Sequence, residues 1–259
     1  MLDINPISAF DDNYIWLLRD SDSTQATVVD PGDEEPILAA LEAQGLELST
    51  VLVTHHHDDH IGGVEALRAT FPEAQVLGPE DRRIHMLTQV VREGDTVELL
   101  ELSGRVQVLE VPGHTSTHIA YLGAGALFCG DTLFAAGCGR VFDGTFDQLA
   151  ASLERITNLP GETRCYCAHE YTLANLEFAS RVEPESISIT QRKQAASELR
   201  GLDQATVPSR LSEELATNPF LRTGIPAVRS AAEAAAGRSL TTGVEVFTAL
   251  RCWKDGRYD

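Results

Sequence analysis

Short apolar runs separated by polar turns occupy the first two-thirds of the chain. The runs are rich in β-branched residues, which is typical of strands. They lie at residues 15–18, 26–29, 50–53, 75–77, 105–111, 119–122, 126–128 and 164–167. Helical spacing of apolar residues predicts helices at 36–44, 62–70 and 146–158. Strands mixed with helices in this way indicate a layered α/β (α+β) fold.

The last third of the chain has a different pattern. After Tyr171 the strand-like runs stop, and Ala, Glu, Leu, Arg and Gln dominate, as in residues 189–202 and 230–237. Most of these residue types favour helices. We therefore expect one domain at residues 1–171 and a second, mostly helical domain at residues 172–259.

The charge of the chain narrows the classes of partner. The sequence has 20 Lys and Arg residues against 39 Asp and Glu, which gives a formal net charge of −19. Proteins that coat nucleic acid need a basic face for the phosphates, so the charge argues against a nucleic-acid partner. An anionic small molecule would need a local group of cations on this acidic protein.

The apolar pattern does not indicate a membrane partner or export. No apolar run approaches the roughly 18 residues that a membrane helix needs. Residues 1–6 lack the basic and apolar regions of a secretory signal. The five cysteines, an odd number, then favour reduced thiols over a disulfide framework. We expect a cytoplasmic protein and a monomer.

One segment concentrates residues that can bind a metal ion. Residues 54–63 have the sequence T-H-H-H-D-D-H-I-G-G and follow a predicted strand. Alternate side chains of an extended segment share a face, so His55, His57 and Asp59 are predicted to converge. His60 is predicted to lie where the chain turns towards a helix, with glycines that permit a tight turn. These ligand types indicate zinc, manganese or iron.

Three further candidate ligands follow predicted strands. His114, Asp131 and His169 each come shortly after an apolar run, and catalytic side chains are expected at strand ends. The alternative is a solvated polar turn rich in histidine, but four of the eight histidines lie in the single block at residues 54–63. The full set of ligands is too large for one tetrahedral ion and suits two ions that share a carboxylate.

The H-x-H-x-D-H block with a later Gly-His, Gly-Asp and His resembles the metallo-β-lactamase superfamily. Four further motifs look like those of its glyoxalase II family, the hydroxyacylglutathione hydrolases: D-D-N-Y (11–14), F-A-A-G-C-G-R (134–140), A-H-E-Y-T (168–172) and N-P-F-L-R (218–222). The resemblance covers nearly the whole chain. It implies an αββα sandwich as the catalytic domain, followed by a helical substrate-binding domain.

The resemblance also implies two divalent metal ions, Zn²⁺ first, with iron or manganese as alternatives. It assigns the ligands as follows: His55, His57 and His114 to the first ion, Asp59, His60 and His169 to the second, and Asp131 to both. Asp59 and Asp131 are the expected catalytic residues. In this family a metal-bound hydroxide attacks a thioester carbonyl, and Asp59 would orient it.

The substrate that the family implies is S-D-lactoylglutathione, which is hydrolysed to glutathione and D-lactate in the second step of methylglyoxal detoxification. Arg140, Phe142, Tyr171, Arg251 and Lys254 match its substrate-binding positions. Arg251 and Lys254 lie three apart in a helical-looking segment, hence on one face, and match a basic pair for the glycine carboxylate of glutathione. Some family members have Lys in place of Arg140, and Tyr in place of Phe142.

A glutathione persulfide dioxygenase of the same superfamily is the main alternative. Such an enzyme is an oxidoreductase with one iron ion held by two histidines and an aspartate. The motif at residues 218–222 and the pair Arg251 and Lys254 favour the hydrolase. A nuclease of the superfamily is disfavoured by the charge of −19, and a non-catalytic metal-binding protein is disfavoured by the complete ligand set.

Overall fold

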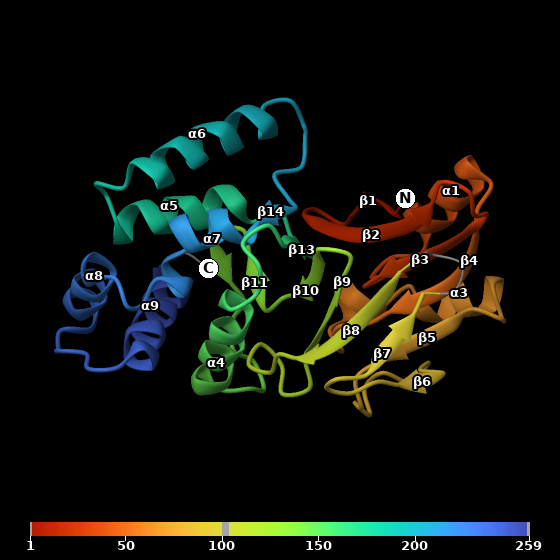
Figure 1. Cartoon of the computed structure of the whole chain (residues 1–259), viewed down its shortest axis with the longest axis horizontal. Helices are drawn as coiled ribbons and strands as arrows, with labels where there is room; N and C mark the ends of the chain where they lie inside the picture. The colour runs from red at the N-terminus through yellow and green to blue at the C-terminus, as the bar shows by residue number, and fades with distance from the viewer. Residues whose placement is uncertain (1, 100–103, 258–259) are drawn as a thin grey trace. The chain divides into compact units, whose positions relative to one another are not determined.

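The computed structural model describes residues 2–99 and 104–257, and the chain forms two compact units (Figure 1). Unit 1 consists of Met1–Glu110 and Thr117–Gly130, and unit 2 consists of Val111–Ser116 and Asp131–Asp259. No helix within the two described ranges is both long and apolar enough to cross a membrane.

The first sheet of unit 1 combines antiparallel and parallel strands. In spatial order its strands are β1 (Leu2–Ala9), β2 (Asn13–Asp20), β3 (Gln25–Val29), β4 (Glu47–Leu52), β5 (Gln75–Gly78) and β6 (Gln89–Val90). Neighbours from β1 to β3 pair antiparallel, and those from β3 to β6 pair parallel. Parallel neighbours need crossover connections, which contain α1 (Glu35–Gln44), α2 (Asp58–Ile61) and α3 (Val64–Thr70).

A hydrophobic core joins this sheet to its helices. The strands and helices both contribute buried side chains to it, among them Leu17, Val28, Ile37, Leu41 and Leu67. Each such side chain contributes about 1.5–3 kcal/mol by burial. Helix α1 has a proline in its first turn and ends at Gly45 with φ 63°, a left-handed conformation that glycine adopts without steric cost. Trp16 of β2 is buried beside Tyr14.

The remaining strands of unit 1 belong to the second sheet. They follow one another in the order β10 (Ala126–Gly130), β9 (Ile119–Gly123), β8 (Arg105–Glu110) and β7 (Thr96–Glu98), all antiparallel. Tyr121 of β9 is fully buried, and its hydroxyl lies 2.9 Å from the Val53 carbonyl oxygen and 3.2 Å from that of Leu77. Burial raises the pKa of Tyr121, so the phenol stays a donor. The two sheets therefore face each other, as a sandwich requires.

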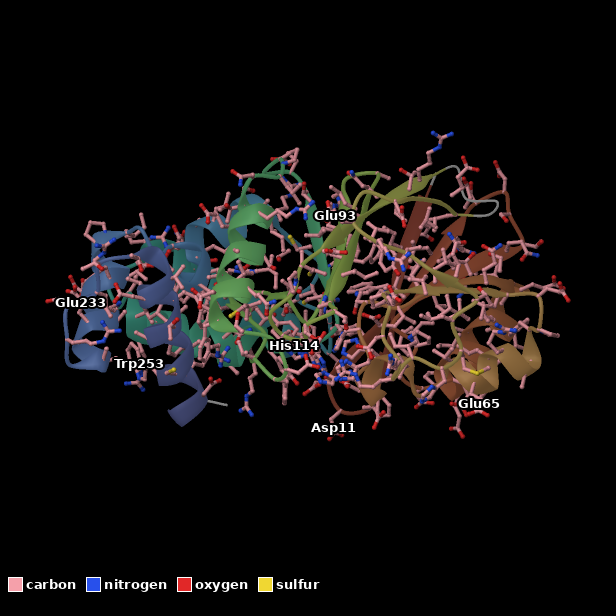
Figure 2. The ribbon with its side chains drawn as sticks, turned by 90° about the horizontal axis from the view of Figure 1, so that it is seen from below. Asp11, Glu65, Glu93, His114, Glu233 and Trp253 are labelled. Carbon is pink, nitrogen blue, oxygen red and sulfur yellow. The ribbon has the colours of Figure 1, made fainter. Side chains whose placement is uncertain are left out.

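Unit 2 is mainly helical. Its helices are α4 (Phe146–Thr157), α5 (Thr172–Val182), α6 (Ile187–Arg200), α7 (Leu211–Thr217), the 3₁₀ helix η1 (Pro219–Leu221), α8 (Pro226–Ala236) and α9 (Gly243–Arg257). The strands β11 (Leu133–Phe134) and β12 (Gly137–Cys138) form a hairpin, and β13 (Arg164–Cys167) pairs with β14 (Ser209–Arg210). Phe178 contacts both Phe220 and Trp253, so α5, η1 and α9 share a core. Trp253 is labelled in Figure 2.

The predicted mixed α/β fold with a helical C-terminal region is confirmed. Every predicted strand and helix has a counterpart, but the short strands β6, β7, β11, β12 and β14 and the eight-residue strand β1 were missed. This strand contains Pro6, which pairs with Trp16 at the edge of the sheet, where a missing N–H is tolerated. The division of function between residues 1–171 and 172–259 stays a prediction.

Candidate metal centre

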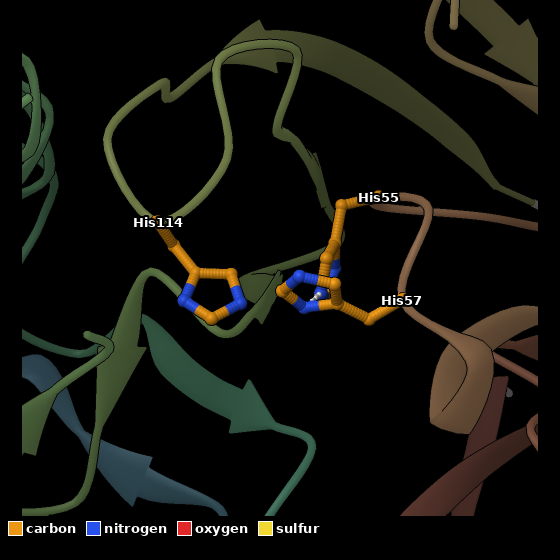
Figure 3. A group of neighbouring side chains, drawn as sticks. All are labelled: His55, His57 and His114. Carbon is orange, nitrogen blue, oxygen red and sulfur yellow. Dashed lines mark hydrogen bonds between the residues drawn. The ribbon is translucent and has the colours of Figure 1, made fainter. Parts of the chain in front are cut away.

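The imidazoles of the histidine block gather within unit 1. The ring of His55 lies 4.7 Å from that of His57 and 4.0 Å from that of His60, measured between centroids. His55 Nε2 is 3.0 Å from His57 Nδ1, and the dashed line in Figure 3 marks this contact. Both His55 and His60 are fully buried. A buried group of imidazole nitrogens at these distances is suited to a transition-metal ion.

Asp59 reaches the block by a different route from the predicted one. The extended backbone ends at His57, and Asp58–Ile61 form α2. The predicted strand-like alternation through Asp59 is therefore wrong. The carboxylates of Asp58 and Asp59 lie in the first turn of α2, where negative charge stabilises the positive end of a helix. Asp59 Oδ2 lies 3.5 Å from His60 Nε2 and accepts a hydrogen bond of 3.0 Å from Asn13 Nδ2. The helical turn brings Asp59 and His60 together.

Glycine is required around the block because a side chain there would clash with neighbouring backbone atoms. Gly62 and Gly63 have φ of −56° and −80°, so neither needs the conformational freedom that the predicted tight turn implied. A Cβ atom at Gly32 would lie 1.9 Å from the carbonyl oxygen of Asp59, and one at Gly62 would lie 2.6 Å from the carbonyl oxygen of Gly32. The backbone before α1 therefore packs directly against α2, and a side chain between them would displace Asp59.

A buried carboxylate supports the block. Asp30 Oδ1 and Oδ2 accept hydrogen bonds of 2.8 Å from the backbone N–H and the hydroxyl of Thr54. Asp30 Oδ2 also lies 3.0 Å from His60 Nδ1. A carboxylate at one ring nitrogen fixes the tautomer, so that the other nitrogen can bind a metal ion. The ring of His118 stacks on that of His55 with centroids 4.6 Å apart.

The other three candidate ligands come together in unit 2. Asp131 Oδ2 lies 3.4 Å from His114 Nε2, and Asp131 Oδ1 lies 3.5 Å from His169 Nε2. His114 Nδ1 is 2.8 Å from the carbonyl oxygen of Arg140. That carbonyl accepts the Nδ1 proton, which leaves Nε2 as the metal-binding atom. Each oxygen of Asp131 thus faces a different imidazole, an arrangement suited to a carboxylate that bridges two ions.

Two of the predicted substrate-binding residues cover imidazoles of unit 2. The ring of Tyr171 stacks on that of His169 with centroids 4.7 Å apart and an angle of 6°. The ring of Phe142 meets that of His114 edge-on at 5.2 Å. Tyr171 is 36% exposed and Phe142 62% exposed, so one side of each ring is open to solvent. Their contact with substrate stays a prediction.

Arg251 is more enclosed than a side chain on a solvated helix face. It lies in α9 and is fully buried. Its Nη1 donates to the carbonyl oxygen of Cys138 at 2.9 Å, and its Nε and Nη2 lie 3.0 and 2.9 Å from Asp255 Oδ1. The guanidinium also lies over the ring of Phe220 at 5.3 Å. These contacts fix the position of the cation.

Lys254 and Arg140 complete a group of cations in unit 2. Lys254 is 6% exposed. Burial, together with the positive charges of Arg251 and Arg140, lowers the pKa of Lys254 to about 8. Arg140 is half-exposed, with Nε 3.9 Å from Asp255 Oδ1. The three cations Arg140, Arg251 and Lys254 outnumber the one carboxylate of Asp255. This part of the acidic protein therefore attracts an anionic ligand.

Asp255 is a residue that the sequence analysis missed. Its spacing of four positions from Arg251 was the available signal, since such pairs meet on a helix. Cys165 and Cys167 are core residues: both are buried, and burial raises the pKa of Cys167 to about 12. Neither thiol is suited to act as a nucleophile.

Two family descriptions together match almost the whole chain. Residues 9–169 match "Metallo-beta-lactamase superfamily", and residues 170–257 match "Hydroxyacylglutathione hydrolase C-terminus". The chain is 54% identical to a hydroxyacylglutathione hydrolase of Alkalilimnicola ehrlichii, over 98% of this chain and 99% of that one. It is 51% identical to one of Vibrio cholerae, with the same coverage of 98% and 99%. The crystal structure of ETHE1 from Myxococcus xanthus is 34% identical, with a TM-score of 0.59, and covers 66% of this chain and 76% of its own.

Proposed function

Because the chain belongs to the hydroxyacylglutathione hydrolase family of the metallo-beta-lactamase superfamily, we propose that it hydrolyses S-D-lactoylglutathione to glutathione and D-lactate. It is a thiolester hydrolase, glyoxalase II. The observation that carries this assignment is the identity of 54%, over 98% of the chain, to a relative named hydroxyacylglutathione hydrolase. The match of residues 170–257 to the family's own C-terminal region favours the hydrolase over the dioxygenase alternative.

We propose that the enzyme holds two divalent metal ions, with Zn²⁺ as the expected ion and iron or manganese as alternatives. Three groups of side chains could hold a metal ion: His55, His57 and His114, which Figure 3 shows; His55, His60 and Asp131; and Asp59, His60 and His169. Together they contain all the predicted ligands. The donor set of imidazoles and carboxylates suits these ions. When bound, the ions would supply an activated water and polarise the thioester carbonyl.

The two aspartates are proposed as the catalytic residues. Asp131 would bridge the ions, because its two oxygens face different imidazoles. Asp59 would orient the attacking water through a hydrogen bond. Its Oδ2 is held by Asn13, which fixes the direction of the carboxylate. A fixed acceptor lowers the reorganisation that the reaction requires.

The cations of unit 2 are proposed to bind the carboxylates of glutathione. Lys254 and Arg140 would contact the ligand, while Arg251, paired with Asp255 and buried, would add positive potential and hold α9 in place. Tyr171 and Phe142 would line the site beside the ligand imidazoles. In this proposal residues 172–259 form the substrate-binding domain. We further propose a monomer that works in the cytoplasm, where the buried thiols of Cys165 and Cys167 stay reduced.

A thioester assay with metal analysis tests the function. We expect the purified protein to abolish the thioester absorbance of S-D-lactoylglutathione and to contain about two metal ions per chain. A single iron ion with oxygen consumption on glutathione persulfide would instead support the dioxygenase. A protein that binds two ions but leaves the thioester intact would refute the substrate assignment.

A further inference from the structure

The hairpin of β11 and β12 has a strained turn. Leu133 pairs with Cys138 and Phe134 with Gly137, so only Ala135 and Ala136 connect the strands. Ala136 has φ 55°, a left-handed conformation in which its Cβ crowds the backbone. Two-residue hairpin turns favour Gly, Asn or Asp at such positions. A strained backbone of this kind persists only where its surroundings hold it.

Side chains from the helices of unit 2 hold this turn. The backbone N–H of Ala136 donates to Glu214 Oε2 at 2.8 Å. On the other side of the same peptide, Asn175 Nδ2 donates to the carbonyl oxygen of Ala135 at 2.9 Å. Asn218 Nδ2 lies 2.8 Å from the carbonyl oxygen of Gly137 and 3.2 Å from Glu214 Oε2. Glu214 therefore anchors both the N–H of the turn and the amide that holds its far side.

Glu214 is itself held by a buried charge. Its side chain is fully buried in α7, where a carboxylate needs an opposite charge. Arg192 of α6 supplies that charge and also donates to Thr217 Oγ1 at 2.6 Å. Burial alone would lower the pKa of Arg192, but the carboxylates of Glu214 and Glu213 raise it. The ion pair ties two helices to one backbone N–H of the hairpin.

Both strands of the hairpin touch the candidate site. The ring of Phe134 meets those of His169 and Tyr171 edge-on, at 5.7 and 5.3 Å. In β12 the carbonyl oxygen of Cys138 accepts the hydrogen bond from Arg251 Nη1. A change in the turn between Phe134 and Cys138 would therefore move the supports of Tyr171 and Arg251, which are proposed to take part in substrate binding.

We propose that Glu214 is a positioning residue for thioester hydrolysis. It holds the turn at Ala136 in its left-handed conformation and thereby sets Tyr171 and Arg251 for substrate binding, without contact with the substrate. The proposal rests on the proposed function of the site. It assigns to Glu214 and Arg192 a role in affinity for glutathione thioesters in addition to the stability of the helices.

Two double variants separate the hydrogen bond from the ion pair. Glu214→Gln with Arg192→Met keeps an acceptor for the N–H of Ala136 and removes both charges. Glu214→Leu with Arg192→Met removes the acceptor as well. We expect the Leu pair to raise KM for S-D-lactoylglutathione about tenfold over the Gln pair, with kcat changed less than about threefold. Adding Ala136→Gly to the Leu pair should restore most of the affinity, because glycine adopts the left-handed conformation without strain.

Equal KM values for the two pairs, or no recovery with Ala136→Gly, would overturn the proposal. Ser212→Ala is the control, since Ser212 lies in the same helix α7 and is exposed, and it should leave KM unchanged. Calorimetry with S-hexylglutathione, which is not a thioester, measures affinity without turnover. Binding without hydrolysis by the wild type would refute the hydrolase function and leave this comparison intact.

Amide hydrogen exchange at residues 133–138 is a readout that needs no ligand. Faster exchange in the Leu pair than in the Gln pair, with α6 and α7 equally protected in both, is the expected result. Equal exchange in the hairpin would show that Glu214 does not fix the turn, whatever the activity of the protein.

Discussion

In unit 1 the candidate ligands come from one block, residues 55–60, whereas in unit 2 they come from three separate loops, at His114, Asp131 and His169. The block is shaped by one helical turn and by a buried carboxylate, Asp30. The loops of unit 2 are placed by strand ends and by packing among helices. Unit 2 also carries the cations and aromatic rings proposed to bind substrate. Changes in unit 1 should therefore act mainly on the metal ions, and changes in unit 2 on metal and substrate together.

The largest effect is expected for Asp131→Ala. The change removes both oxygens that face the imidazoles of unit 2, so it should deplete metal and lower kcat/KM about a thousandfold or more. Metal content and thioester hydrolysis, measured on the same preparation, check this. Asp147→Ala, at an exposed position of α4, is the control. Full activity of the Asp131 variant would contradict the comparison between the units, because the ligands of unit 1 alone would then hold the metal ions needed for hydrolysis.

A smaller loss is expected for Asp30→Asn in unit 1. An amide has one uncharged acceptor oxygen, so asparagine cannot serve both Thr54 and His60 Nδ1 as the carboxylate does. Loss of such a partner costs roughly 10–100-fold in metal affinity or activity. Titration of the metal-free protein with Zn²⁺ measures the affinity. The exposed Asp22→Asn change should have no effect. A rise in KM at unchanged metal affinity would contradict a purely metal-centred role for unit 1.

Arg251→Ala should affect substrate and stability together. We expect KM to rise about tenfold, because the positive potential falls, with a smaller change in kcat. The fully buried side chain leaves a cavity, and Asp255 keeps only the more distant Arg140 as an ion-pair partner, so the free energy of unfolding should fall by about 2–4 kcal/mol. Denaturant unfolding measures that change. An unchanged unfolding free energy would mean that Arg251 acts as an exposed anchor.

The smallest effect is a dependence of KM on pH. Lys254 has a pKa lowered to about 8, so it is charged below that pH and neutral above it. We expect KM to rise a few-fold as the pH increases through about 8, because a neutral amine binds carboxylates weakly. Lys254→Met should raise KM and flatten the profile. Lys193→Met, at a partly exposed lysine paired with Glu177, should keep the wild-type profile.

The two units also differ in how far their sites could be predicted. The block in unit 1 is local, so its ligands could be proposed from six consecutive residues. Even there the position of Asp59 in a helix was missed, because extended and helical turns place the same residues in different directions. In unit 2 the loops after strands were proposed, but Glu214 was not. It is 78 positions from Ala136, and its partner is a backbone N–H, which leaves no side-chain signal in the sequence.

The two tryptophans of the chain lie one in each unit, Trp16 in β2 and Trp253, labelled in Figure 2, in α9. A chain with Trp253→Phe therefore fluoresces only from unit 1, and a chain with Trp16→Phe only from unit 2. Coincident unfolding curves would describe one cooperative transition, and separated curves would assign a stability to each unit. The same pair of variants would show whether added zinc raises the unfolding midpoint of both units or of only one.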